Sequence, residues 1–435
     1  MDFYEAKEKI DSLGRFGSVL GLDNIYNLLE RLGNPQDKVN IVHVAGTNGK
    51  GSTIAYLSSI LTKAGYMVGK YTSPVVFEYL EKYQINGKNI SEECFAKLAE
   101  RVLQAVEEMV NDGQGQPTIF EVETAMAYLY MYESGCDISL IETGMGGDND
   151  ATNVCSKVLA SVIVSVSLDH TSYLGETLTE IAGHKAGIIK YGCPVVLYGQ
   201  SAEVEKVVAR CAKEKNAHLV ISDTKVSVEV PFSYKTFNGI MYEDITPSLK
   251  GTHQIKNLCT VLEVVEKLKE QGFIIPKDDV YSGIRETVWH GRFEKISDEP
   301  YIVIDGAHNP GAVMELKNTL EKDYDDTDFV FIMGVFADKD FSTEIDMVCH
   351  KASKIITVTP DNPRALSASK LAETIKNICK DKDVSVAVSV EEAVKMAVDA
   401  YDSMSESCRQ SGRRRMILAF GSLSYLRDLT KICLK

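Results

Sequence analysis

The sequence predicts an α/β protein with two domains. Short runs rich in β-branched residues alternate with longer segments of helical period through most of the 435 residues, which is typical of parallel α/β layers. A single hydrophobic core stops growing at roughly 250–300 residues, so two domains are expected. Hydrophobic residues make up 44% of the chain and charged residues 25%, which is typical of a globular protein with a large core.

Buried strands of the first domain are expected where β-branched and other apolar residues run together. These runs are residues 41–44, 138–141, 159–166 and 194–197. Beyond residue 225, valines at positions 226, 228 and 230 alternate with other residues, and aromatic residues follow. This pattern indicates a small antiparallel excursion, to which we assign no function.

A second α/β series begins near Arg292. Its expected strands are residues 301–304, 329–333, 355–358, 384–388 and 416–420. Helical segments separate these strands, so the domain boundary is placed near residue 293. Residues 1–293 are expected to form a mostly parallel sheet domain, and residues 294–435 a smaller Rossmann-like α/β domain.

The charge of the chain limits its partners. A formal net charge of -15 argues against nonspecific binding to nucleic acid, because phosphates require a concentrated positive surface. The densest basic run, at positions 413–415, precedes the apolar residues 416–420 and is expected to be a solvated turn leading into a strand. Anionic substrates must then be met by local cations or by a metal ion.

Cysteine usage and the start of the chain indicate a cytoplasmic protein. The ten cysteines form no C-x-x-C pair, and the first residues have neither the basic start nor the apolar run of a signal peptide. Reduced thiols are therefore expected. No stretch approaches the roughly 18 consecutive apolar residues of a spanning helix, so no membrane contact is expected.

A glycine-rich loop follows the expected strand at residues 41–44 and precedes a helix with Ile54, Leu57 and Ile60 on one apolar face. The loop consists of Gly46, Thr47, Asn48, Gly49, Lys50, Gly51 and Ser52. Its glycines permit a tight turn in which backbone N–H groups face phosphate oxygens, and the helix N-terminus adds partial positive charge. With the full charge of Lys50, the segment is interpreted as a phosphate-binding loop (P-loop).

The loop departs from the usual pattern G-x-x-x-x-G-K-[ST], because Gly51 follows the lysine and the hydroxyl groups come later. A glycine-rich turn alone would be weak evidence, and the alternative is a tight turn with a solvated lysine. The succession of strand, loop, lysine, hydroxyl groups and helix favours phosphate binding.

Further segments occur in a characteristic order. They are YTSP at 71–74, ETGMGG at 142–147, DATN at 150–153, LDHT at 168–171, KAGI at 185–188, HQIKN at 253–257, GR at 291–292 and DGAHNP at 305–310. Together with the loop, they resemble the Mur ligase superfamily, and within it the folylpolyglutamate and dihydrofolate synthases. The resemblance covers nearly the whole chain and implies an ATP-binding domain followed by a C-terminal ligase domain.

A magnesium site is expected at the carboxyl edge of the first sheet. Glu142 ends the strand at 138–141, where ligands of open α/β sheets collect, and its carboxylate could bind Mg²⁺ or pair with a lysine. His170 follows another strand, although a lone loop histidine is an unusual magnesium ligand. The resemblance implies Ser73, Glu142 and His170 as metal ligands.

The resemblance also implies that Lys185 is carbamylated and contacts a second Mg²⁺. A protonated lysine beside Mg²⁺ would repel the metal ion, whereas a carbamate offers two hard oxygen ligands. Burial would favour the neutral amine that reacts with carbon dioxide. The alternative is an unmodified lysine that binds substrate carboxylate or phosphate directly.

Nucleotide contacts are implied for the later segments. Asn257, Arg292 and Asp305 match positions at which relatives hold ATP. Arg292 could neutralise phosphate, and Asp305 could accept hydrogen bonds from the ribose or base. His308 is expected to line the same cleft, with no role assigned. Without the resemblance, these would be ordinary surface or capping residues.

Five positions depart from the pattern of many relatives. Val75 and Val76 replace histidine and leucine, Asp148 replaces a basic residue, His184 replaces glutamate, and His290 replaces proline. These departures concern the folate-facing contacts and the surroundings of Lys185 more than the ATP chemistry.

The resemblance implies an ATP-dependent ligase that joins L-glutamate to the terminal carboxylate of a reduced folate. The carboxylate would first take the γ-phosphoryl group of ATP, and the glutamate amine would then attack the acyl phosphate, giving ADP and phosphate. The expected partners are these small molecules, and the enzyme is expected to be a monomer. The second domain is expected to close onto the first during the reaction.

Three alternatives stay open. A dihydrofolate synthase, or a bifunctional enzyme, would use the same chemistry on dihydropteroate. A cell-wall Mur ligase would need a uridine-nucleotide domain before the P-loop, where only 45 residues precede Gly46. A nucleotide-gated regulatory protein would keep the loop without needing the set Ser73, Glu142, His170 and Lys185.

Overall fold

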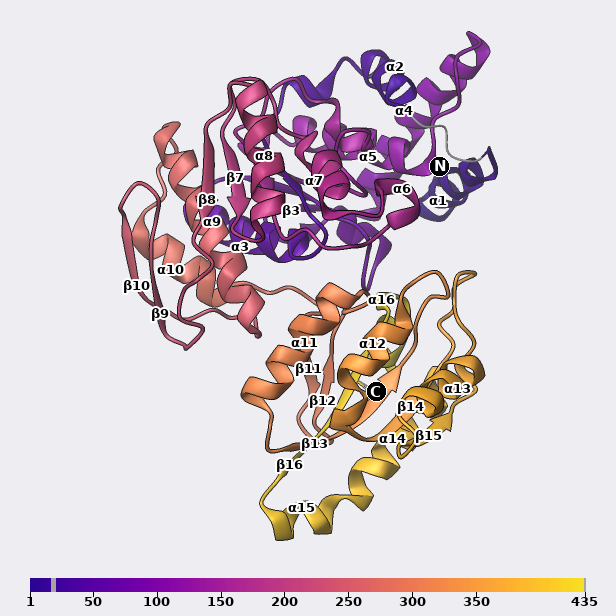
Figure 1. Cartoon of the computed structure of the whole chain (residues 1–435). Coiled ribbons are helices and arrows are strands. Elements are labelled where there is room, and N and C mark those ends of the chain that lie inside the picture. Colours follow the sequence, from indigo (N-terminus) through magenta and orange to yellow (C-terminus); the bar gives the residue numbers. More distant parts are fainter. Residues whose placement is uncertain (17–20, 434–435) are drawn as a thin grey trace. The chain divides into compact units, whose positions relative to one another are not determined.

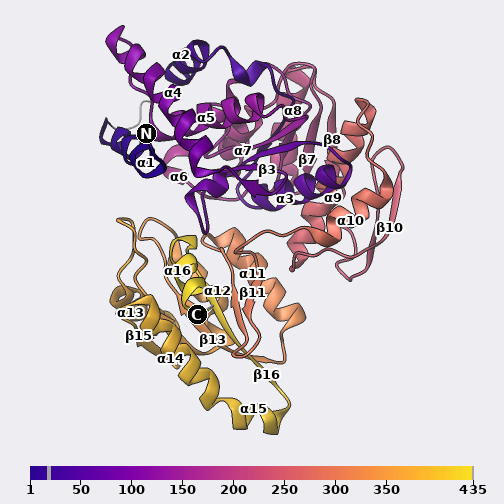
Figure 2. The ribbon, with the colours of Figure 1, turned by 180° about the vertical axis from the view of Figure 1, so that it is seen from behind.

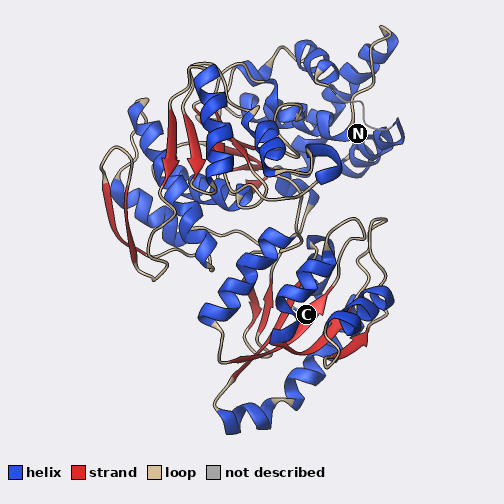
Figure 3. Ribbon diagram, viewed as in Figure 1, coloured by secondary structure: helices blue, strands red, loops and turns tan. Residues whose placement is uncertain are grey.

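The computed structural model describes residues 1–16 and 21–433 and confirms the α/β class, with helices flanking two separate parallel-rich sheets (Figures 1 and 3). The chain divides into two compact units. Unit 1 comprises Met1–Ser248 and Gln254–Val288, and unit 2 comprises Leu249–His253 and Trp289–Lys435. None of the helices described here is both long and apolar enough to cross a membrane.

Unit 1 is built on an eight-stranded sheet with the strand order β4-β3-β2-β5-β1-β6-β7-β8. The strands are β1 (Ile41–Ala45), β2 (Val68–Tyr71), β3 (Tyr83–Ile85), β4 (Lys88–Asn89), β5 (Ile138–Glu142), β6 (Ala160–Ile163), β7 (Val195–Tyr198) and β8 (Leu219–Ser222). All neighbouring pairs from β2 to β8 are parallel, whereas β3 and β4 pair antiparallel at one edge. β1 therefore lies between β5 and β6, which brings the segments after these three strands to one edge.

The helices of unit 1 cover both faces of this sheet (Figure 2). They are α1 (Phe3–Ser12), α2 (Asp23–Arg31), α3 (Lys50–Lys63), α4 (Glu92–Asn111), α5 (Ile119–Glu133), α6 (Thr171–Leu174), α7 (Leu178–Ala186), α8 (Ala202–Glu214), α9 (Thr252–Glu270) and α10 (Lys277–Glu286). One apolar cluster joins α1, α2, α4 and α5, and a second joins α7 and α8 to the sheet. Burial of these faces accounts for the alternation of strand and helix patterns in the sequence.

Helix α3 differs from its expected amphipathic character. Its residues are buried without a break from Gly51 to Ser58, so the helix has no solvent face along this stretch. α10 packs against it so closely that a Cβ atom on Gly283 would lie 2.5 Å from the Cα of Ile60. The predicted apolar face with Ile54, Leu57 and Ile60 is buried, but the expected exposure of the opposite face is wrong, because a second layer of helix covers it.

The predicted antiparallel excursion is a two-stranded hairpin formed by β9 (Phe232–Lys235) and β10 (Met241–Ile245). The valines at positions 226, 228 and 230 lie outside both strands. Tyr234 and Tyr242 instead attach the hairpin to α9, because their hydroxyl groups each donate a 2.7 Å hydrogen bond to Glu263 and Glu266, respectively. The contacts with α9, and not the alternation of the valines, therefore determine where these strands lie.

Unit 2 contains a six-stranded sheet with the order β11-β12-β16-β13-β14-β15. The strands are β11 (Glu294–Ser297), β12 (Ile302–Ile304), β13 (Thr327–Met333), β14 (Ala352–Thr357), β15 (Asp383–Val386) and β16 (Arg414–Phe420). The helices are α11 (Pro310–Asp323), α12 (Phe341–Val348), α13 (Ala368–Ile378), α14 (Val390–Ser403), α15 (Ser405–Ser411) and α16 (Leu423–Cys433). Only β11 pairs antiparallel, so the predicted parallel series is confirmed, with one additional edge strand.

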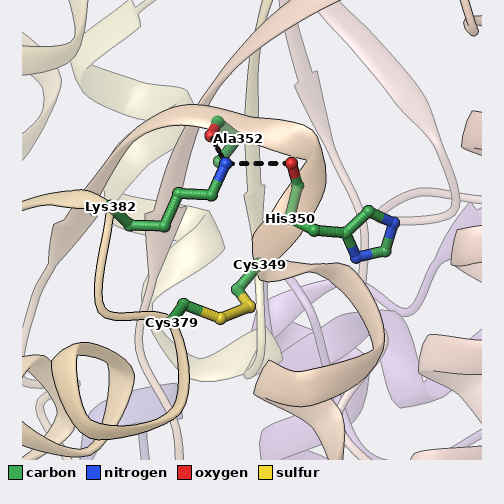
Figure 4. The surroundings of a disulfide bond; sticks show 5 residues. All are labelled: Cys349, His350, Ala352, Cys379 and Lys382. Atoms are coloured by element: carbon green, nitrogen blue, oxygen red, sulfur yellow. Dashed lines mark hydrogen bonds between the residues drawn. A yellow bond between two sulfur atoms is a disulfide. The ribbon is translucent and has the colours of Figure 1, made fainter.

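A disulfide bond joins Cys349 and Cys379 in unit 2 (Figure 4). The two residues are 30 positions apart, and their Cα atoms lie 6.8 Å from each other at the ends of neighbouring helical segments. Lys382 lies beside this disulfide, and its Nζ donates hydrogen bonds to the carbonyls of His350 at 2.9 Å and Ala352 at 2.8 Å. The expectation of reduced thiols is wrong for this pair, because only the folded arrangement of α12 and α13 brings these cysteines together.

Candidate functional site

The loop between β1 and α3 is shaped by close backbone approaches. A Cβ atom on Gly46 would lie 2.2 Å from Cγ2 of Val164, and one on Gly49 would lie 2.7 Å from Oδ1 of Asn257. Gly49 also has a φ of +91°, which disfavours residues with a side chain. Both glycines are therefore required by the fold, and the structure places the predicted residue Asn257 directly against the loop.

The loop is anchored to the segment that follows β6. The backbone N–H of Thr47 donates to the carbonyl of Ser165 at 2.7 Å. The Thr47 hydroxyl donates to the carbonyl of Ser167 at 3.1 Å and accepts from its N–H at the same distance. This segment continues to Asp169 and His170, so the loop and the predicted histidine belong to one connected edge of the sheet.

Lys50 begins α3, and its side chain turns back over the loop. Its Nζ donates to the carbonyls of Gly46 at 3.2 Å and Thr47 at 3.3 Å. The same Nζ lies 3.8 Å from Oε1 of Glu142 at the end of β5. The structure thus brings the predicted lysine and the predicted carboxylate together, although 92 positions separate them in the sequence.

Glu142 is only 5% exposed and lies between Lys50 and another predicted metal ligand, Ser73. While Oε1 faces Lys50, Oε2 accepts a 3.2 Å hydrogen bond from the backbone N–H of Ser73. The Glu142 carboxylate and the hydroxyl of its neighbour Ser73 are both hard oxygen donors, the kind of ligand that Mg²⁺ prefers. The residues present therefore fit a magnesium ion at this edge.

Lys185, in the last turn of α7, reaches the same loop. Its side chain is buried, and Nζ donates a 2.9 Å hydrogen bond to the carbonyl of Gly46. Burial, and to a smaller extent the nearby charge of Lys50, lower the pKa of this amine to about 7, against smaller opposing effects of Asp169 and Asp150. A substantial fraction of Lys185 is therefore neutral near pH 7, which suits reaction with carbon dioxide.

His170 is the most solvent-exposed of the predicted ligands. It precedes α6 with a φ of +51°, and its Nε2 lies 3.9 Å from Oδ2 of Asp169. Across residues 1–16 and 21–433, no three His, Cys, Asp or Glu side chains form a ready metal cluster. Of the four predicted metal ligands, only Glu142 and His170 are of these residue types. The other two are Ser73 and Lys185.

Two buried residues near the loop escaped the sequence prediction. Gln254 donates to the Ser52 hydroxyl at 3.2 Å and accepts from Asn257 at the same distance, so it connects α9 to the loop. Lys70 in β2 is only 7% exposed; burial lowers its pKa to about 8 against the raising effects of Glu81 and Glu142. A lysine inside an otherwise apolar strand was the signal that could have identified Lys70.

The predicted nucleotide residues of unit 2 surround Asp305, which follows β12. Its carboxylate oxygens accept 2.8 Å hydrogen bonds from the backbone N–H groups of Phe293 and Ala307. Burial raises the pKa of Asp305, and the nearby Arg292 opposes that rise. His308 Nδ1 lies 2.7 Å from the carbonyl of Gly306, so the structure gathers Arg292, Asp305 and His308 in one turn region.

The departures at positions 148, 184 and 290 make definite contacts. His184 Nδ1 lies 2.9 Å from Oδ2 of Asp148, so two of the departures are partners of each other. His290 Nδ1 lies 2.7 Å from Oε1 of Glu294, whose other oxygen accepts from the N–H of Gly291. His290 therefore helps to shape the turn before Arg292.

The basic run at 413–415 borders a cavity of about 560 Å³ in unit 2, a volume in the usual range of ligand pockets. Each arginine has a carboxylate partner: Asp328 for Arg413, Asp326 for Arg414 and Glu299 for Arg415. Because these charges are already neutralised, the run ties β16 to its neighbours and does not form an anion site.

Comparison with known proteins gives a consistent result. The Mur ligase middle domain family matches residues 44–265, and the glutamate ligase domain family of the Mur ligases matches residues 291–423. The chain is 34% identical over 441 aligned residues to the dihydrofolate synthase/folylpolyglutamate synthase of Bacillus subtilis, covering 99% of this chain and 98% of that protein.

Two further relatives extend this result. The dihydrofolate synthetase of Saccharomyces cerevisiae is 31% identical, with 95% of this chain and 97% of that protein covered. The folylpolyglutamate synthase of Mycobacterium tuberculosis, crystallised with ADP and AMPPCP, is 27% identical and superposes with a TM-score of 0.91 over 100% of this chain and 99% of that one. The chain therefore belongs to the folylpolyglutamate and dihydrofolate synthase family of the Mur ligases.

Proposed function

We propose that this ATP-dependent ligase adds L-glutamate to the terminal carboxylate of a reduced folate or of its polyglutamates. The observation that carries the proposal is the convergence of Lys50, Glu142 and Lys185 on the P-loop of a chain that belongs to this family. A phosphate loop alone would suit many nucleotide-binding proteins. A regulatory protein gated by nucleotide would have no use for a buried lysine and a buried carboxylate at the loop.

The reaction must activate a carboxylate before an amine can attack it. The folate carboxylate oxygen bonds to the γ-phosphorus of ATP as the bond to the bridging oxygen of ADP breaks. The glutamate amine then attacks the carbonyl carbon, phosphate leaves, and the amine loses a proton. Lys50 would neutralise phosphate charge in the first step, where two anions must meet, and most of the remaining catalysis would come from positioning.

Ser73 and Glu142 would hold a magnesium ion. When bound, it would neutralise charge on the phosphates. His170 and Lys185, the latter carbamylated on Nζ, would form a second magnesium site, and the lowered pKa of Lys185 supports its carbamylation. Glu142 keeps one oxygen toward Lys50 and the other toward the backbone of Ser73, so this carboxylate is oriented before any ligand arrives.

We propose nucleotide contacts for the residues that the sequence analysis singled out. The backbone of residues 46–52 would face the phosphates, and Asn257 would contact the nucleotide from α9. Arg292 would bind phosphate, and Asp305 and His308 would border the ribose or base. Each of these side chains lies in a turn at the end of a strand or in a helix packed on such a turn.

Dihydrofolate synthase activity is the second candidate, alone or together with glutamate addition. It is favoured by the relatives in B. subtilis and S. cerevisiae, whose names include that activity. The substitutions at Val75 and Asp148 favour folate over dihydropteroate as the better substrate. We therefore expect a higher kcat/KM for tetrahydrofolate or its polyglutamates than for dihydropteroate.

A substrate panel tests both candidates. ADP formation is measured with dihydropteroate, tetrahydrofolate and a reduced folate diglutamate, each with and without L-glutamate. Glutamate-dependent ADP release with the folates supports the proposal, and a higher kcat/KM for dihydropteroate would establish the second candidate instead. ADP release that does not depend on L-glutamate would refute both candidate functions.

The enzyme is further proposed to act as a cytoplasmic monomer on small molecules, without nucleic acid or membrane partners. Its net charge of -15 supports the first exclusion. Size-exclusion chromatography with light scattering checks the monomer, because a mass near 48.0 kDa is expected.

A further inference from the structure

Helix α7 and the glycine turn after β5 are joined by a side-chain pair that takes no part in the proposed phosphoryl transfer or amide formation. His184 Nδ1 lies 3.0 Å and 2.9 Å from the two carboxylate oxygens of Asp148. At the same place, the backbone N–H of Asp148 donates to the carbonyl of His184 at 2.9 Å. The two residues therefore contact each other through both their side chains and their main chains.

The packing around this pair leaves little freedom. A Cβ atom on Gly147 would lie 2.5 Å from the carbonyl oxygen of His184, and one on Gly187 would lie 2.4 Å from Cβ of Asp148. Asn153 bridges the two segments by donating to the carbonyls of Asp148 and Gly187, each at 3.1 Å. The turn and the end of α7 are thus fastened to each other at several points.

Both fastened segments carry a residue of the site. The turn begins directly after Glu142, whose carboxylate lies 3.8 Å from Lys50. The residue after His184 is Lys185, whose amine reaches the carbonyl of Gly46 at 2.9 Å. A shift of the end of α7 relative to the turn would move Lys185 away from the loop and from Glu142.

We propose that Asp148 and His184 are positioning residues that hold Lys185 at the phosphate loop. The proposal rests on the role assigned to Lys185 in the ligase reaction. The contact does not depend on titration, because Nδ1–H can donate to a carboxylate from either a neutral or a protonated imidazole. The side chains are 35% and 40% exposed, so the pair adds little to stability, and its effect is expected on geometry.

Four variants separate a positioning role from a structural one. His184→Phe keeps a ring but removes the donor, whereas His184→Asn keeps an amide donor near the place of Nδ1. Asp148→Ala removes the acceptor, and Asp148→Ala/His184→Phe removes both. Steady-state ADP release with saturating L-glutamate and tetrahydrofolate gives kcat, and titration of ATP gives its KM.

His184→Phe and Asp148→Ala should each lower kcat by about tenfold, since a misplacement of about 1 Å can cost about 100-fold. The KM for ATP should stay within about twofold, because the P-loop itself is intact. His184→Asn should retain most of the activity. The double variant should be no slower than the slower single variant, because the second change has no contact left to remove.

Hydrogen–deuterium exchange gives a readout that does not require turnover. Exchange in peptides that span residues 143–153 and 180–188 should rise in His184→Phe and stay near wild type in His184→Asn. The melting temperature should change by only a few degrees in all four variants. Lys97→Gln, which breaks an exposed 2.7 Å ion pair with Glu93, is the matched control and should change none of these quantities.

Unchanged kcat in both single variants would overturn the proposal, and so would losses that multiply in the double variant. Loss of activity that accompanies unfolding, or exchange that does not respond, would also overturn it. A wild-type enzyme without glutamate-dependent ADP release would instead refute the proposed function. In that case the exchange data alone decide whether the pair holds α7.

Discussion

Glu142 and Asp305 occupy equivalent places in the two units, since each ends or follows a buried strand at the carboxyl edge of its sheet. Their surroundings differ. Both oxygens of Asp305 accept hydrogen bonds from backbone N–H groups at 2.8 Å, whereas Glu142 accepts one from the Ser73 N–H at 3.2 Å and lies 3.8 Å from the charged Nζ of Lys50. One carboxylate fixes a turn through two backbone hydrogen bonds, and the other already faces the cation of Lys50.

The comparison shows that position at a strand end does not define the role of a carboxylate. Asp305 accepts hydrogen bonds from the backbones of residues 293 and 307, so removing its charge should mainly lower the stability of the protein. Glu142 faces lysines and a serine, so its replacement should mainly lower the rate of the reaction. The following variants test this difference, from the largest expected effect to the smallest.

Lys50→Ala should lower the rate of ADP release by about 10³-fold or more, because a positive charge on the transferred phosphoryl group is lost. Far-UV circular dichroism and glutamate-dependent ADP release are measured on the same preparation. The fold should persist, since the hydrogen bonds of the Lys50 side chain go to carbonyls of its own loop. Lys63→Ala, an exposed lysine on the same helix, is the control, and normal turnover by a folded Lys50→Ala enzyme would contradict the assignment of the loop.

Lys185→Ala should abolish ligation, and short carboxylic acids should restore part of it by replacing the carbamate. The wild-type enzyme should respond to bicarbonate more strongly at pH 8 than at pH 6. The neutral amine needed for carbamylation becomes more abundant as the pH rises through the lowered pKa of about 7.

The measurements for Lys185 are ADP release with and without added acid, and electron density of crystals grown with bicarbonate, magnesium and nucleotide. Lys213→Ala, an exposed lysine on α8, is the control. A bare amine in the density, together with no rescue by any acid, would rule out the carbamate and leave direct substrate binding by the lysine.

Glu142→Gln should lower kcat by about 100-fold and raise the magnesium concentration needed for half-maximal activity, because an amide is a weaker ligand for Mg²⁺. Magnesium titrations of ADP release give both quantities. Glu263→Gln replaces a buried carboxylate that binds Tyr234 and should leave the magnesium dependence unchanged. Equal magnesium dependence in both variants would remove Glu142 from the metal site.

Asp305→Asn should lower the free energy of unfolding by about 1–3 kcal/mol, because its amide group would face a backbone N–H that has lost its acceptor. Urea denaturation followed by circular dichroism measures the change. Asp326→Asn, at an exposed aspartate paired with Arg414, should have almost no effect. If Asp305→Asn kept full stability but weakened nucleotide binding, Asp305 would resemble Glu142 and the contrast between the two would fail.

Much of the fold could be predicted from local patterns. Apolar runs marked β1 and β5 closely, because a strand buried on both faces needs apolar residues throughout. The same reasoning missed β2, whose four residues include Gly69 and Lys70, and it placed the hairpin strands too early. Short strands with polar or small residues carry too weak a periodic signal to be recognised.

The sequence by itself determined the phosphate loop, since glycine, lysine and the following helix are consecutive residues whose geometry is local. Only the tertiary structure decided which distant groups meet there. Lys185 and Gly46 are 139 positions apart, and they touch because β1 is paired with β6 while α7 packs nearby. Periodicity reports which residues are buried, but strand order and register decide their neighbours, and these are set by the packing of the whole sheet.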